Sequence, residues 1–497
     1  MRASGILMPV FSLPSRYGIG SFSKSAYQFV DMLKKAGQKY WQILPLCPTS
    51  YGDSPYQSFS TYAGNPYFID LDQLIEEKLL TRKECQACDF GDDPQDIDYG
   101  KLYENRFKLL RKAYERANVG EDQEFEAYRR ENAWWLDDYA LFMAVKDRFD
   151  GVAWNEWAED IRLRWSNAID YYRRELYYEI EFYSYLQFVF MKQWKKLKNY
   201  ANINGIEIIG DIPIYVAFDS ADAWANPELF QFDAENLPTA VAGCPPDGFS
   251  ADGQLWGNPL YRWDYHRETG FDWWIRRIAY CSELYDVVRI DHFRGFDEYY
   301  SIPYGDTTAR NGHWEKGPGI ALFEAAKNRL GELNIIAEDL GYITDSVKKL
   351  VADSGFPGMK VLEFAFDSRE KSDYLPYTYE KNSVVYTGTH DNETIAGWYA
   401  GLDKSDLKMC TDYMNIDRIP GKEYHWDFIR LAMLSVSDLC VIPIQDYLGL
   451  DNRARINHPS TLGTNWRWRL AKGQLSASLL KEIREMTRIS GRLQNGE

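Results

Sequence analysis

The amino-acid sequence predicts an α/β fold: a (β/α)8 TIM barrel with inserted helical and irregular subdomains. Eight short apolar runs recur along the 497 residues, with amphipathic helical sequence between them. Each run is continuously apolar, which is typical of parallel strands that are buried on both faces. Eight strand-then-helix units indicate that the sheet closes into a barrel. The predicted strands are 5–10, 40–46, 206–212, 287–290, 335–337, 361–366, 384–387 and 439–444.

The first predicted strand leads into an amphipathic helix over 25–36, which Gly37 ends. The second and third strands are separated by more residues than one crossover helix needs. We therefore expect a helical insertion at 72–160. Clear helical patterns cover 124–149 and 168–200.

A second insertion is expected at 217–275, between the third and fourth strands. This segment is rich in Gly, Pro, Asp and Trp, which predicts irregular structure over the barrel mouth. A helical stretch at 469–493 follows the eighth strand, so we expect no C-terminal β-sandwich domain. The chain is then a single catalytic barrel spanning 1–497.

The charge balance excludes two classes of partner. The chain carries 57 Lys and Arg against 74 Asp and Glu, a formal charge of −17. Nucleic-acid binding requires a basic surface, and anionic membranes also attract basic segments. No apolar run approaches the roughly 18 residues of a membrane span. We expect neither nucleic acid nor membrane as a partner.

Cysteine usage indicates a reducing compartment. The seven cysteines are odd in number and scattered, and a chain of this length does not need disulfide bonds for stability. We therefore expect a cytoplasmic protein. Cys85 and Cys88 form a C-x-x-C pair, but no second pair lies at zinc-ligand spacing, so we assign the pair no function.

Aromatic residues are unusually abundant, with 17 Trp, 36 Tyr and 25 Phe. Most of these rings would pack a large core. The remainder suit a ligand that is apolar on one face and hydroxylated at its edge, and a sugar has this character.

Carboxylates lie at or just after the C-terminal ends of four of the predicted strands: Asp211, Asp291, Glu338 and Asp391. Functional groups of a barrel lie at the C-terminal ends of its strands, and a buried carboxylate is costly unless it is paired or used. One alternative is that each carboxylate caps the helix that follows it. Arg289 lies two residues before Asp291, on the same side of the strand, and such a cation would keep Asp291 ionised and nucleophilic.

Paired carboxylates with aromatic walls are typical of glycoside chemistry. One carboxylate attacks the anomeric carbon and a carboxylic acid protonates the leaving oxygen. In retaining enzymes the two groups lie about 5 to 5.5 Å apart, a separation that neighbouring strands can provide. The six histidines never fall at the i, i+4 spacing of a helical zinc site. His292 and His390 are therefore expected to donate hydrogen bonds to sugar hydroxyls, with no metal and no cofactor.

Several long motifs resemble one family. The runs 289–295, 337–341 and 389–394 are similar to those of amylomaltases, the 4-α-glucanotransferases or disproportionating enzymes of glycoside hydrolase family 77 in the α-amylase superfamily. The likeness extends along nearly the whole chain. Further matching runs are 14–20, 51–57, 210–216, 253–259, 457–459 and 465–469.

The resemblance implies a retaining double displacement that transfers α-1,4-glucan segments to the 4-OH of glucose or another glucan. It implies that Asp291 is the nucleophile, Glu338 the general acid and base, and Asp391 the transition-state stabiliser, aided by His390. Tyr56 resembles the ring under the donor sugar, supported by Asp211. Tyr51 resembles part of a second glucan site. Five residues resemble acceptor-side or flanking contacts: Ser54, Gln254, Trp256, Asp367 and Asn465.

Two other functions remain open at this point. An amylase-type hydrolase would use water as its acceptor, but many α-amylases carry Asn-His where this chain has Tyr215-Val216. A catalytically silent glucan-binding barrel would lack a rim carboxylate, and this chain keeps all four. Transfer requires that water be excluded, and we expect Trp256 to belong to a lid that does so.

Overall fold

A computed structural model describes residues 2–50, 52–246, 250–341, 343–417 and 423–493. Eight parallel strands close into a barrel in which each strand neighbours the next along the chain, and the last pairs with the first. The predicted fold class is confirmed. The strands are β1 (Ala3–Leu7), β2 (Tyr40–Gln42), β3 (Glu207–Pro213), β6 (Val287–Asp291), β9 (Ile335–Ala337), β10 (Gly358–Val361), β11 (Ser383–Tyr386) and β12 (Leu439–Pro443).

The sixth strand lies earlier than predicted. The apolar run at 361–366 contributes only Val361 to β10, and its next three residues form the 3-10 helix η7 (Leu362–Phe364). An apolar run shows that residues are buried but does not distinguish a strand from a short helical turn. The strand itself contains Gly358 and Lys360, which weakened its apolar pattern.

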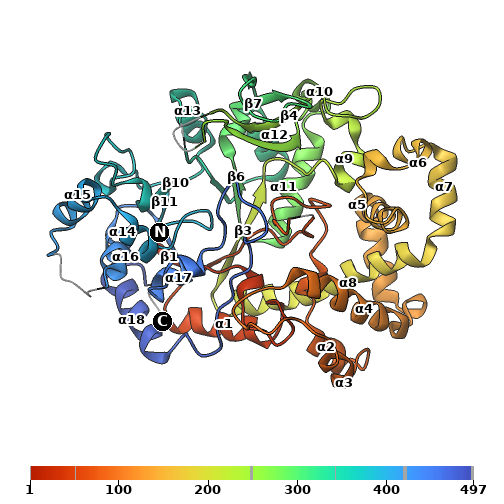
Figure 1. Cartoon of the computed structure of the whole chain (residues 1–497), viewed down its shortest axis with the longest axis horizontal. Helices are drawn as coiled ribbons and strands as arrows, with labels where there is room; N and C mark the ends of the chain where they lie inside the picture. Colours follow the sequence, from red (N-terminus) through yellow and green to blue (C-terminus); the bar gives the residue numbers. More distant parts are fainter. Residues whose placement is uncertain (1, 51, 247–249, 342, 418–422, 494–497) are drawn as a thin grey trace.

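Helices surround the barrel as Figure 1 shows. They include α1 (Lys24–Lys35), α11 (Asp272–Leu284), α12 (Ile320–Leu330), α13 (Asp345–Ser354), α14 (Ile395–Gly401), α15 (Lys404–Met414), α16 (His425–Leu434), α17 (Ile444–Tyr447) and α18 (Ala477–Ile489). None of the helices in the described part of the chain combines the length and apolarity that a membrane crossing needs.

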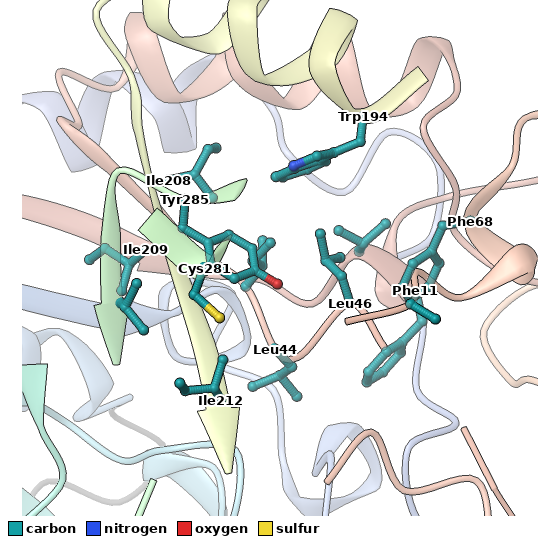
Figure 2. Packing of buried hydrophobic residues seen from close by; sticks show 14 of the residues in the cluster. Phe11, Leu44, Leu46, Phe68, Trp194, Ile208, Ile209, Ile212, Cys281 and Tyr285 are labelled. Atoms are coloured by element: carbon teal, nitrogen blue, oxygen red, sulfur yellow. The ribbon is translucent and has the colours of Figure 1, made fainter. Parts of the chain in front are cut away.

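The layer between the barrel and its helices is closely packed (Figure 2). Trp194 and Tyr285 are buried here, and the Trp194 indole N–H donates to the carbonyl of Leu284 at 3.1 Å. Gly210 in β3 faces Tyr285 so closely that a Cβ atom on it would lie 2.1 Å from the ring. This contact fixes the outward face of β3, so the neighbouring Asp211 points into the barrel.

Between β2 and β3 the chain forms a group of helices that Figure 1 shows on the right of the barrel. The helix predicted over 168–200 is two helices that meet at Leu176. The boundaries 72–160 stay a prediction. The helices are α2 (Leu71–Glu76), α3 (Arg82–Gln86), α4 (Tyr99–Ala117), α5 (Gln123–Arg148), α6 (Glu159–Arg162), α7 (Ser166–Glu175) and α8 (Tyr177–Ile203).

The segment 217–275 is more regular than predicted. It contains α9 (Ala221–Ala225), β4 (Ala240–Cys244), β5 (Gln254–Pro259) and α10 (Trp263–Glu268). These two strands join an antiparallel sheet of order β5-β4-β7-β8, completed by β7 (Glu298–Pro303) and β8 (His313–Lys316). Strand β5 pairs with β4, but the second partner of β4 is β7, which follows β6 in the chain, so a local pattern could not indicate that pairing.

Candidate active site

A cavity of about 490 Å³ opens at the mouth of the barrel. Its walls come from the loop after β2, the end of β3, strand β5, the end of β6, and the loops after β6, β11 and β12. Seven predicted site residues line it: Ser54, Tyr56, Gln254, Trp256, Asp291, His390 and Asp391. His292, which was expected to donate to sugar hydroxyls, also lines it. Others that line it were not predicted as site residues, among them Gln57, Asn258, Asn457 and Trp466.

Arg289 joins two of the predicted carboxylates. Its Nη1 donates to both oxygens of Asp211, at 2.7 and 2.6 Å, and its Nη2 donates to Oδ1 of Asp291 at 3.1 Å. Arg289 and Asp211 are buried and directly opposite in the β3–β6 register. Burial raises the pKa of Asp291, and the guanidinium of Arg289 opposes that rise.

Glu338 lies beside Asp291 because of strand register. Ile290 in β6 pairs with Ala337 in β9, so the next residue of each strand is one of the two carboxylates. Adjacent strands are about 4.8 Å apart. The Glu338 oxygens accept the N–H groups of His292, at 2.6 Å, and Leu340, at 2.9 Å.

Glu338 holds its proton more strongly than an ordinary glutamic acid. Burial raises its pKa, and the negative charge of Asp291 raises it further. The two backbone N–H groups and Arg289 favour the ionised form, but they do not outweigh these effects. The neighbouring pair therefore combines a carboxylate next to an arginine with a carboxylic acid, as proton donation requires.

Asp391 is held from two sides. Its Oδ2 lies 3.3 Å from Nε2 of His390, and its Oδ1 accepts the Asn457 amide at 2.6 Å. Burial favours the neutral acid, but His390 and Asn457 outweigh it and lower the pKa of Asp391 to about 2. Asp391 is therefore ionised at neutral pH and can stabilise positive charge.

Tyr56 contacts both His390 and Asp211. Its ring stacks on His390, with centroids 5.0 Å apart and an angle of 14° between the planes. Its hydroxyl donates to Oδ2 of Asp211 at 2.8 Å. Tyr56 thus presents a fixed aromatic surface beside the carboxylates.

On the opposite wall, Trp256 meets His292 edge to face, with centroids 4.8 Å apart. The Trp256 indole N–H donates to the Gln254 side chain at 3.1 Å. Burial lowers the pKa of His292 to about 3, so this ring is neutral at pH 7. Its buried Nε2 has no hydrogen-bond partner in the described part of the chain.

Five predicted residues within the described ranges are not among those that line the cavity: Asp211, Arg289 and Glu338, which contact residues that line it, and Asp367 and Asn465. Asp367 forms an ion pair with Arg369 at 2.6 Å. The Asn465 side chain accepts the N–H of His458 at 2.9 Å, so it supports the loop that carries Asn457. Tyr51 lies outside the described residues. For Asp367, Asn465 and Tyr51, a contact with glucan stays a prediction.

Sequence reasoning missed the role of Asn457, because it follows no predicted strand directly. The matching run 457–459 contained the residue but did not indicate that it contacts Asp391. In the described residues, no cluster of three or more His, Cys, Asp and Glu side chains could hold a metal ion.

Comparison with known proteins identifies close relatives. The sequence model of a family described as 4-alpha-glucanotransferase matches residues 8–475. The 4-alpha-glucanotransferase of Clostridium butyricum is 50% identical over 487 residues, which cover 98% of this chain and 100% of the relative. That of Thermus thermophilus is 45% identical over 501 residues, which cover 99% of each chain.

A solved structure is similar over the same length. The amylomaltase of Streptococcus agalactiae in complex with acarbose has a TM-score of 0.96 and 44% identity. The match covers 99% of this chain and 100% of that one. The amylomaltase of Corynebacterium glutamicum, at 19% identity and a TM-score of 0.78, shows the shared fold.

Proposed function

The chain belongs to the 4-α-glucanotransferase family, the amylomaltases, and we propose that the cavity at its barrel mouth is where it transfers α-1,4-glucan segments. Family membership favours transfer over the two alternatives, an amylase-type hydrolase and a silent barrel. The observation that supports the proposed site is the β6–β9 register, which makes Asp291 and Glu338 neighbours. Asp211, Arg289 and Asp391 surround this pair.

In the first step, Asp291 attacks the anomeric carbon of the donor sugar. Arg289 holds Oδ1, and the described residues leave Oδ2 without a hydrogen bond, so we assign the attack to Oδ2. The bond from the anomeric carbon to the glycosidic oxygen breaks, and Glu338 gives that oxygen its proton. The shortened glucan leaves with a free 4-OH, and the glycosyl group remains as an ester of Asp291.

In the second step, the 4-OH of an acceptor glucan or glucose enters the cavity. Glu338, now a carboxylate, takes the hydroxyl proton while the oxygen attacks the anomeric carbon and the Asp291 ester breaks. Two inversions give net retention. Asp391 stabilises the positive charge that develops on the ring in both steps, and its fixed hydrogen bonds keep it in place.

The aromatic side chains would bind the sugars on either side of the cleaved bond. Tyr56 offers its face to the donor sugar, and its hydroxyl is already engaged by Asp211. Trp256 and Gln254 form the acceptor wall on β5. This acceptor wall would exclude water from the Asp291 ester until an acceptor binds, which favours transfer over hydrolysis.

The first experiment incubates the purified protein with maltotriose and resolves the products by chain length over time. A ladder of longer maltooligosaccharides with glucose, abolished in Asp291→Ala, is the expected result. Maltose and glucose without longer chains would instead indicate hydrolysis. No turnover would contradict the proposed site.

A further inference from the structure

The loop of residues 387–394 carries His390 and Asp391 and is held at both ends by one carboxylate. Asp446 lies in α17, directly after the neighbouring strand β12. Its Oδ2 accepts the Thr387 hydroxyl at 2.5 Å, where the loop begins. Its Oδ1 accepts the N–H of Ile395 at 2.8 Å, where the loop ends and α14 begins.

Asp446 is separate from the substrate cavity. It is 1% exposed and is not among the residues that line the mouth. It lines a second, smaller cavity instead, which His390 also lines. Thr387 and Ile395 are also fully buried. A carboxyl group in such surroundings is costly, and its two hydrogen bonds offset this cost only while both loop ends stay in place.

Other contacts hold the same loop from either side, one after β12 and one after β10. Asn452 accepts the N–H of Thr394 at 3.1 Å and donates to Glu393 at 2.9 Å. The Glu363 carboxyl lies so close to Gly388 that a Cβ atom there would be 2.7 Å from Oε1. The loop therefore has little room to shift, and Asp446 is the group that contacts both of its ends.

We propose that Asp446 is a positioning residue for the transfer reaction, which sets the place of His390 and Asp391 by holding both ends of the 387–394 loop. Asp391 acts through charge on the transition state, and such stabilisation depends on preorganised distance. A displacement near 1 Å can cost about 100-fold in rate. Ground-state sugar binding relies more on Tyr56 and Trp256, which lie on other elements. Loss of Asp446 should therefore lower kcat more than it raises KM.

The test measures kcat and KM for maltotriose disproportionation in Asp446→Ala and Asp446→Asn. In Asp446→Ala, we expect kcat to fall at least about tenfold with KM within about threefold. In Asp446→Asn, the amide oxygen still accepts from Ile395 and the amide nitrogen donates to the Thr387 hydroxyl. This variant should recover kcat to within about threefold of the unaltered protein, because position and not charge is what the loop needs.

Asp222→Ala supplies the matched control. Asp222 is also a buried carboxyl that accepts a backbone N–H, from Thr61 at 2.8 Å, and it lies in α9, away from the loop. We expect Asp222→Ala to lower the melting temperature without a selective loss of kcat in the folded protein. An equal kcat loss in both alanine variants would overturn the proposal, as would unchanged kcat in folded Asp446→Ala.

If Asp446→Ala does not fold, Thr387→Val and Thr387→Ser test the same contact from the other partner. Valine removes the hydroxyl at nearly constant volume, and serine keeps it. The expected result is a drop in kcat of about threefold or more in Thr387→Val, largely absent in Thr387→Ser. Equal kcat in the two variants contradicts the proposal. The inference rests on the proposed role of Asp391, and the maltotriose ladder of the unaltered protein tests that role separately.

Discussion

Arg289 holds Asp211 more firmly than it holds Asp291. Two hydrogen bonds of 2.7 and 2.6 Å reach Asp211, whereas a single one of 3.1 Å reaches Asp291. The stronger hydrogen bonds of the guanidinium thus go to Asp211, to which the proposed mechanism gives no reacting role. Asp291, the proposed nucleophile, keeps a nearby cation that favours its ionised form, yet its Oδ2 remains available for attack.

Replacing Asp211 with Asn should change both rate and pH dependence. The negative charge of Asp211 raises the pKa of Asp291, so its removal lowers that pKa. The acid limb of the kcat/KM profile should therefore move to lower pH. The value of kcat/KM should also fall by about 10- to 100-fold, because the buried Arg289 loses a charged partner. An acid limb that stays in place would contradict this electrostatic link.

The unaltered protein should show a bell-shaped profile of kcat/KM against pH. Activity needs Asp291 ionised and Glu338 protonated, so it is lost as pH falls through the pKa of Asp291 and as pH rises through that of Glu338. Burial raises both pKa values. Both limbs should therefore lie above the ordinary values of about 3.9 for Asp and 4.3 for Glu.

Glu338→Gln is the variant that checks the assignment of the alkaline limb. It should lose that limb and most of the activity, since a glutamine cannot give the leaving oxygen a proton. If the residual activity of Glu338→Gln still shows the alkaline limb, then a group other than Glu338 is responsible for that limb.

Asn457→Ala should weaken transition-state stabilisation. The substitution removes the 2.6 Å hydrogen bond to Asp391, which is one of the contacts that lower the pKa of this carboxylate. We expect kcat/KM to fall about tenfold or more, in line with a lost charge-assisted hydrogen bond. Asn457→Asp places a second negative charge beside Asp391 and should reduce activity further. If the alanine variant is as active as the unaltered protein, then Asn457 does not contribute to transition-state stabilisation.

Trp256→Ala should shift the balance from transfer toward hydrolysis. The indole forms part of the cavity wall on β5, and its loss opens that wall to water. We expect the hydrolysis-to-transfer ratio, measured as reducing ends formed against chain-length redistribution, to rise at least about threefold. Trp165→Ala is the control, because Trp165 is exposed directly before α7, among the helices between β2 and β3, and should leave the ratio unchanged. An unchanged ratio in folded Trp256→Ala would exclude the lid role.

The sequence predicted the barrel and the carboxylates at its rim because both follow from local pattern. Parallel strands buried on both faces leave continuous apolar runs. Asp211, Asp291 and Glu338 lie within or directly after such a run, and Asp391 follows its run within four residues. The topology rule then places these carboxylates at one rim. No distance information was needed for that step.

Features that depend on distant partners could not be predicted in the same way. The second sheet pairs β4 with β7 across the whole of β6, and its strands lack the signature of doubly buried segments. Asn457 meets Asp391 through a loop whose path depends on the fold. The pairing of Arg289 with Asp211 depends on the β3–β6 register, although the rim carboxylates themselves were predicted.

The order of strands in the second sheet affects how the protein is assembled on the ribosome. Strands β4 and β5 are made before β6, whereas β7 and β8 are made after it. The edge of β4 that β7 will cover stays unpaired until residues beyond Asp291 have emerged. The wall bearing Trp256 is therefore completed only after Asp291 has been synthesised, and any nascent chain that stops at β6 exposes an open sheet edge to its neighbours.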